Sequence, residues 1–223
     1  MSFPPRYRTP RARSRVEAAG AESRAKAVRA AIELFSTAGY RGTSIALVAE
    51  KADLSQSGLL HHFPNKAALL AAVLEHREAE DGRFLAGTDD RPPLGWAAFD
   101  ALTSLVARNS NRPELVGLFV RLSAEATESG HPAHAWLHDH YTSTRNWLTD
   151  AIRDGQDRGE IHPDAPVAAL VRLTIATLDG LQQQWLLDTG ATDMVADFTT
   201  FVSGLRAQWD ITPAADGSSA TVE

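Results

Sequence analysis

The sequence predicts an all-α fold of about nine helices, with a small N-terminal helical domain followed by a larger one. Apolar residues recur at helical spacing in one segment after another, and strand-like alternation is absent. Clusters of Gly, Pro, Asn, Asp and Ser separate these segments. The 223 residues are enough for one larger domain or two small ones.

The first predicted helix covers residues 23–38. Four of its apolar residues follow the i, i+3, i+4, i+7 pattern of one buried face: Val28, Ala31, Ile32 and Phe35. Gly39 is the expected C-cap, because glycine readily adopts the left-handed backbone found there. Residues 1–20 carry five arginines and three prolines without apolar periodicity, so we expect a disordered arm.

Two short helices joined by a tight turn are predicted next, a helix-turn-helix motif at about residues 44–63. Thr43 or Ser44 caps the first of them. The turn contains Asp53, a residue type that tolerates left-handed backbone better than most. Ser55 caps the second helix, whose polar side chains are expected to face outward.

Pro64 ends this motif, because the residue before a proline is disfavoured in helical geometry. Asn65 caps the next helix, which runs toward Phe84, and residues 87–95 form the clearest break. Five further helical segments are predicted, at 95–109, 113–127, 133–159, 166–187 and 193–209. The expected organisation is an arm, a first domain, a second domain and a loose tail: 1–20, 21–70, 71–210 and 211–223.

Composition excludes several classes of protein. There is no cysteine, so disulfides, thiolate metal sites and cysteine nucleophiles are excluded. The sequence has no run of about 18 apolar residues and no apolar signal-peptide core, so we expect a cytoplasmic protein without a membrane span. The net charge of −6 divides into +6 for residues 1–70 and −12 for the remainder. A basic first third favours contact with phosphates, although residues 21–70 alone retain only +2.

The second helix of the motif begins with side chains suited to a DNA groove. Gln56 can pair with adenine, Ser57 can donate or accept, and Gly58 allows close approach of the backbone. Nearby helix N-termini and Lys66 suit phosphates. The predicted DNA contacts are Thr43, Ser44, Ser55, Gln56, Ser57, Gly58, Leu60, His61, His62 and Lys66. Spacing alone leaves open an ordinary helical hairpin with a polar surface.

Three sequence runs resemble the N-terminal domain of TetR-type repressors. They are VRAAIELF at 28–35, AGYRGTS at 38–44 and LSQSGLLHHFPNK at 54–66, within a block of about 50 residues. The resemblance implies a three-helix DNA-binding domain, a larger helical ligand-binding domain and a homodimer on a palindromic operator. It also implies release from double-stranded DNA when a small-molecule effector binds.

Two residues depart from the family pattern. Leu60 stands where the family often has a tyrosine whose hydroxyl reaches a phosphate, so the contact implied there is in doubt. Asp53 replaces the glycine of the turn and adds a negative charge near DNA. The arginines of residues 1–20 leave two interpretations open, contact with DNA or a solubilising extension.

The dimer implied by the resemblance is expected to use the last two long helices. Apolar stripes run along both of them, and each stripe could face a partner or only its own core. The predicted interface residues are Leu170, Thr174, Leu178, Leu181, Trp185, Phe198, Phe201, Val202 and Leu205.

The effector site is expected among aromatic and apolar residues of the second domain. The candidates are Trp96, Phe99, Leu102, Phe119, Leu122, Trp136, Tyr141, Trp147, Leu178 and Gln182. Each also suits an ordinary core. Few positive charges accompany them, which favours a fairly hydrophobic effector that is neutral or cationic.

Four histidines suggest a competing function. His131, His134, His138 and His140 lie within ten residues, and His134 and His138 have the i, i+4 spacing that can hold zinc. The glutamate of a catalytic His-Glu-x-x-His motif is missing, so a metal-dependent helical enzyme is the weaker alternative. A helical module that binds protein is another. We expect no cofactor, no metal ligands and no catalytic residues.

Overall fold

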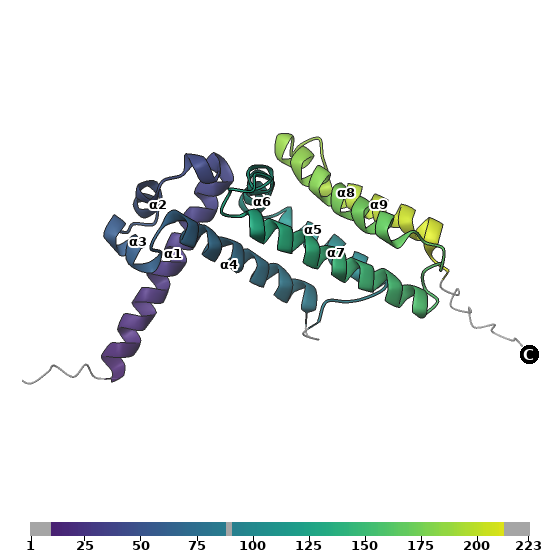
Figure 1. The fold of residues 1–223 in the computed structure, drawn as a ribbon, viewed down its shortest axis with the longest axis horizontal. Coiled ribbons are helices and arrows are strands. Elements are labelled where there is room, and N and C mark those ends of the chain that lie inside the picture. The colour runs from purple at the N-terminus through teal and green to yellow at the C-terminus, as the bar shows by residue number, and fades with distance from the viewer. Residues whose placement is uncertain (1–9, 88–90, 212–223) are drawn as a thin grey trace, which may run out of the picture. The chain divides into compact units, whose positions relative to one another are not determined.

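The computed structural model describes residues 10–87 and 91–211, with side chains from residue 18 onward. Within these ranges the chain forms nine helices and one isolated bridge, between Ile161 and Asp210. The helices are α1 (Pro10–Gly42), α2 (Ile45–Lys51), α3 (Gln56–His62), α4 (Lys66–Ala86), α5 (Trp96–Asn109), α6 (Pro113–Glu125), α7 (His134–Asp157), α8 (Val167–Leu187) and α9 (Met194–Trp209) (Figure 1). The predicted all-α fold is confirmed.

Helix α1 is longer than predicted. The expectation of a disordered arm at residues 1–20 is wrong for residues 10–20, which are helical. This stretch is rich in Arg and Ala, which are strong helix formers, and Pro10 is tolerated at the first position of a helix. The predictions for residues 1–9 and 212–223 lie outside the described residues.

The chain divides into two compact units. The first comprises Met1–Arg77 and Gly117–His134, and the second comprises Glu78–Val116 and Ala135–Glu223. The predicted boundary at residue 70 lies seven residues before the end of the first segment of this unit. No signal in the sequence indicated that Gly117–His134 belongs with the N-terminal unit. Helices α4 and α6 each continue from one unit into the other.

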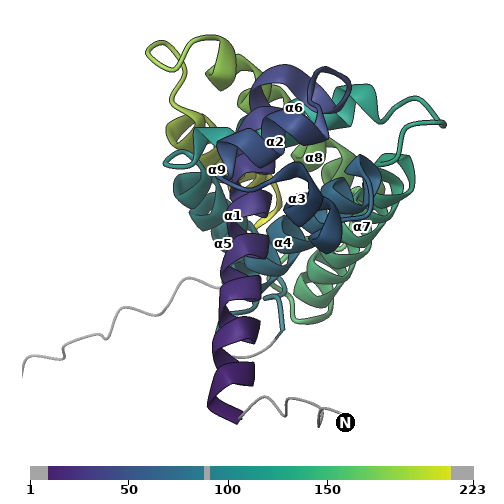
Figure 2. The same cartoon turned by 90° about the vertical axis from the view of Figure 1, so that its left-hand side faces the viewer.

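In the first unit, α1, α2 and α3 pack against one another around a small apolar core (Figure 2). Phe35 from α1, Val48 from α2 and Leu59 from α3 are fully buried. Burial of such a side chain stabilises the fold by about 1.5–3 kcal/mol. These three residues therefore hold the short helices in place although neither is long enough to be stable alone.

In the second unit, α9 packs against both α5 and α8. The core of this unit contains large, fully buried side chains from three helices and a loop: Phe99, Leu148, Ile152, Ile161 and Phe198. The loop residue Ile161 is fixed by the bridge to Asp210, next to the end of α9.

Candidate nucleic-acid interface

Helix α2 begins at a serine cap. Ser44 has extended backbone, and its Oγ accepts a hydrogen bond from the N–H of Leu47 at 3.2 Å. Val48 and Ala49 are buried, whereas Leu47 on the other side of α2 is exposed. Of the two predicted caps, Ser44 is therefore the one that the chain uses.

Thr43 is buried instead of exposed. Its side chain is 2% exposed, and its Oγ1 donates to the carbonyl of Gly39 at 2.8 Å. The hydroxyl thus closes the turn between α1 and α2, and the phosphate contact predicted for Thr43 at the helix N-terminus stays a prediction.

The turn between α2 and α3 has the left-handed residue that the sequence predicts. Asp53 has a φ of 54°, the one positive φ among the described residues other than glycine. The N–H of Leu54 then donates to the carbonyl of Ala49 at 2.9 Å, which ends α2. A short polar side chain tolerates this conformation better than most, so the missing glycine leaves the motif intact.

Helix α3 is fixed at its start by Ser55, whose Oγ accepts from the N–H of Gly58 at 3.0 Å. A Cβ on Gly58 would lie 3.0 Å from the same Oγ, a tighter contact than usual, so the cap favours glycine there. Leu59 is buried on the inner side of the helix. The exposed side carries Gln56, Ser57, Leu60 and His61, whereas His62 is half-buried.

Lys66 is anchored within the first unit. Its ammonium group donates to the carbonyls of Tyr40 and Thr43, both at 2.9 Å, and lies 4.2 Å from the centre of the Tyr40 ring. Two of its three N–H donors are thus used inside the protein. Lys66 joins the start of α4 to the segment before α2, a role that sequence reasoning missed.

The N-terminus of α4 keeps the predicted cap. Asn65 is exposed, and its Oδ1 accepts from the N–H of Ala68 at 2.8 Å. A second cation near the motif comes from α1, where the Arg24 guanidinium lies 5.1 Å from the centre of the Phe63 ring. The sequence did not reveal Arg24, because it lies 39 positions before Phe63.

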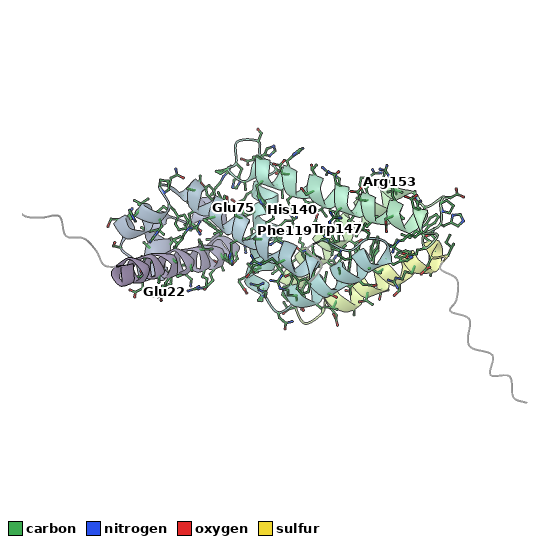
Figure 3. All side chains as sticks on the ribbon, turned by 90° about the horizontal axis from the view of Figure 1, so that it is seen from below. Glu22, Glu75, Phe119, His140, Trp147 and Arg153 are labelled. Carbon is green, nitrogen blue, oxygen red and sulfur yellow. The ribbon has the colours of Figure 1, made fainter. Side chains whose placement is uncertain are left out.

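The predicted effector residues do not all belong to one unit. Phe119 and Leu122 lie in the first unit, and the other eight lie in the second. Trp96, Phe99 and Leu102 are buried core residues of α5. His140 and Trp147 lie along α7 (Figure 3), and the indole N–H of Trp147 donates to the carbonyl of Pro93 at 2.9 Å.

Carboxylates of α4 and α8 contact two of the candidates on α7. The Tyr141 hydroxyl donates to Asp179 Oδ2 at 2.8 Å, and Trp136 Nε1 donates to Glu78 Oε2 at 3.1 Å. Gln182 Oε1 is buried without a hydrogen-bond partner. An unsatisfied buried acceptor costs about 1–3 kcal/mol, and a ligand that donated a hydrogen bond to this oxygen would remove that cost.

The apolar stripes of α8 and α9 are covered within a single chain. Six of the predicted interface side chains are buried there: Leu170, Thr174, Trp185, Phe198, Val202 and Leu205. These six side chains form part of the core of their own unit, and their contact with a partner stays a prediction. Leu178, Leu181 and Phe201 are partly exposed.

The four histidines do not gather around a common point. His131 lies against Glu125, the Nδ1 of His134 lies 2.8 Å from the carbonyl of Ala126, His138 pairs with Asp139, and His140 stacks on Trp136. Among the described residues, no three side chains that could bind a metal come together. The geometry thus does not support the metal-enzyme alternative.

None of the helices described is long and apolar enough to cross a membrane.

A three-helix unit with a serine-capped, outward-facing second motif helix defines a helix-turn-helix DNA-binding protein. Comparison with family models gives the same class. The model for bacterial regulatory proteins of the tetR family matches residues 27–73, and the model for the C-terminal domain of BetI-type transcriptional repressors matches residues 98–214. The second match alone covers more than half of the chain. The chain belongs to the TetR family and is a DNA-binding transcriptional regulator.

Individual relatives agree over most of their length. The chain is 29% identical over 191 residues to the HTH-type transcriptional regulator UidR of Escherichia coli, covering 83% of this chain and 90% of UidR. It is 28% identical over 190 residues to the HTH-type transcriptional regulator TtgR of Pseudomonas putida, covering 81% and 88%. The solved SmeT–triclosan complex has a TM-score of 0.73 at 17% identity, over 86% of this chain and 93% of SmeT. At 17% identity, the similarity to SmeT establishes a shared fold.

Proposed function

We propose that this protein is a homodimeric repressor that binds a palindromic operator and releases it when a small hydrophobic effector binds. The observation that carries the proposal is the exposed face of α3, where Gln56, Ser57, Leu60 and His61 point away from the core. Family membership supports dimerisation and effector control. As a regulator of bacterial genes it acts in the cytoplasm, and it needs no catalytic residue.

The contacts divide into base readout and phosphate binding. Gln56 and Ser57 read base edges in the major groove, while the capped N-termini of α2 and α4 bind phosphates through free N–H groups. His61 adds a donor on the same exposed face of α3. Lys66 supports this arrangement from inside the unit, through its two carbonyl contacts.

Selection of duplexes from a random-sequence library by the wild-type protein tests the proposal. We expect a palindrome whose half-sites lie about one DNA turn, roughly 34 Å, apart. Affinity for the selected duplex is expected to fall steeply as salt rises, because phosphate contacts release counterions. Failure to enrich any sequence, or an affinity that salt does not change, would support the protein-binding alternative instead.

Leu60 is expected to contact the C5-methyl group of a thymine. It is 37% exposed on the face that carries Gln56, and an aliphatic side chain in the major groove recognises that methyl group. Replacing the thymine with uracil removes one methyl, which is worth about 0.8 kcal/mol or roughly fourfold in affinity. We expect this loss with wild-type protein and none with Leu60→Ala.

The measurement is a double-mutant cycle of protein and duplex, read by fluorescence anisotropy. Uracil at a thymine outside the half-sites serves as the control and is expected to change nothing. If Leu60→Ala lowered affinity equally for every thymine-containing and uracil-containing duplex, Leu60 would have a role other than base readout.

The effector is proposed to carry a hydrogen-bond donor on a hydrophobic body. The buried Gln182 Oε1 lacks a donor, and Asp179, about one turn earlier on α8, accepts a hydrogen bond from the Tyr141 hydroxyl. Acceptors and carboxylates disfavour an anionic ligand. The solved complex of SmeT with triclosan makes that phenol, together with its methyl ether, a suitable matched pair.

A thermal-shift panel of phenols and amines, each beside its donor-free methyl derivative, measures this preference. At about 100 times the dissociation constant, a ligand stabilises the native state by about 2.7 kcal/mol, which raises Tm by several degrees. We expect this shift for the donor-bearing members, and Gln182→Leu to reduce it. Stabilisation by donor-free or anionic members alone would refute the assignment.

A further inference from the structure

Helix α1 and the segment formed by the end of α6 and residues 126–131 are joined by contacts inside the first unit. Arg121 Nε donates to the carbonyl of Ser36 at 2.6 Å, and the N–H of Tyr40 donates to Glu125 Oε2 at 3.2 Å. Arg41 also forms an ion pair with Glu128, but both side chains are more than half exposed, so water screens this pair and it contributes little. All these residues belong to the same compact unit.

The first two contacts replace a hydrogen bond that α1 cannot make. Gly39 has φ 70° and ψ 176°, far from helical values, so the N–H of Tyr40 is turned away from the carbonyl four residues earlier. That carbonyl belongs to Ser36. Arg121 supplies a donor to it and Glu125 supplies an acceptor to Tyr40, and these two side chains are four residues apart on one face of α6.

Tyr40 then links this point to the DNA-binding motif. Its carbonyl accepts from Lys66 Nζ at 2.9 Å, and its ring lies under the same ammonium group at 4.2 Å. Lys66 also holds the carbonyl of Thr43, the residue before the cap of α2. Burial raises the pKa of the Tyr40 hydroxyl, so the phenol stays neutral.

His131 packs beside Glu125 and Tyr40. Its side chain is 1% exposed, and its ring packs edge-on against the Tyr40 ring at 5.0 Å. Nδ1 accepts from the N–H of Ala133 at 3.1 Å, so in the neutral ring the proton is on Nε2. That nitrogen lies 3.3 Å from Glu125 Oε2 but makes no hydrogen bond.

We propose that Arg121 and Glu125, here called the α6 clasp, are positioning residues for DNA binding. By completing the backbone hydrogen bonding at Gly39, they fix the direction in which the chain enters α2 and hence the setting of α3. The inference rests on the proposed DNA-binding function. It adds that residues about 85 positions away in the sequence control the geometry of the recognition helix.

The test measures binding of each variant to the duplex that the wild-type protein selects from a random library. Glu125→Ala is expected to weaken binding about tenfold, since Tyr40 loses its acceptor. Glu125→Gln keeps an acceptor oxygen and is expected to restore affinity to within about twofold. The matched control is Glu128→Ala, which removes an exposed carboxylate from the same segment and is expected to leave affinity unchanged.

Amide hydrogen exchange distinguishes positioning from general stability. In Glu125→Ala we expect faster exchange at Tyr40 and in α2, with α8 and α9 unchanged. Equal affinity of Glu125→Ala and wild type would overturn the inference while leaving the proposed function intact. Uniformly faster exchange, or no rescue by Glu125→Gln, would also overturn it. A wild-type protein that selects no duplex would overturn the proposed function itself.

Discussion

Replacing Gly180 with arginine is expected to separate the dimer and to weaken operator binding about 100-fold or more. Gly180 lies in the middle of α8, on the side opposite the buried stripe. Around it, at coiled-coil spacing, lie Leu173, Ala176 and Leu187, and the two leucines are 55% and 81% exposed. Exposed leucines around small residues allow two helices to approach closely, so we assign this face to the subunit contact.

The size of the effect follows from bivalence. A dimer that holds two half-sites gains about 10²–10⁴ in affinity over one half-site, and a separated subunit loses that gain. A Cβ on Gly180 would meet only the flexible amide of Gln184, at 4.0 Å, so the single chain accommodates the change. Analytical ultracentrifugation and operator binding measure the two consequences.

The matched control for this variant is Gly82→Arg. Gly82 also lies within a helix, α4, and a Cβ there would meet nothing within 4 Å. We expect it to remain dimeric and to bind DNA normally. A Gly180→Arg protein that still sediments as a dimer would place the subunit contact elsewhere.

Sequence reasoning succeeded where the signals are local. Ser44 and Ser55 cap their own helices, and Asp53 takes the left-handed backbone that the turn requires. Each of these roles depends on a residue and its neighbours within about four positions, so a single sequence contains the necessary information.

The apolar stripes of α8 and α9 do not identify the dimer contact by themselves. An apolar stripe such as Leu170, Thr174 and Trp185 shows that a helix buries one face, but it does not show what covers that face. In α8 the chain's own core covers it, and the outer face carries small residues and two exposed leucines, which look like ordinary surface in sequence. Only the fold separates the two faces.

The α6 clasp could not have been predicted from the sequence at all. Gly39 predicted a break at the end of the first helix, and its backbone does leave helical geometry there. The partners that satisfy the broken backbone, Arg121 and Glu125, lie on another helix in what the sequence assigned to the second domain. Pairings over such a distance depend on tertiary packing, which composition and periodicity do not report.

Replacing Gly39 with alanine is expected to destabilise the protein by about 2–4 kcal/mol and to abolish tight operator binding. The backbone at φ 70° and ψ 176° lies in a region that is essentially restricted to glycine, where another residue costs about 1–3 kcal/mol. A Cβ at this position would also lie 2.0 Å from Glu125 Oε1. Since that oxygen ends a flexible side chain, Glu125 can move away, but Tyr40 then loses its hydrogen bond, which costs about 1 kcal/mol more.

Urea unfolding and operator binding of Gly39→Ala can be compared with those of Gly159→Ala. Gly159 has nearly the same φ, 69°, but a Cβ there would meet nothing within 4 Å. The control is therefore expected to lose about 1–2 kcal/mol from backbone strain alone and to keep its affinity for DNA. If both variants lost the same stability and neither lost affinity, Gly39 would be needed only for its backbone conformation. If Gly39→Ala alone loses affinity at concentrations of urea where it remains folded, the kink and the α6 clasp together set the geometry of the motif.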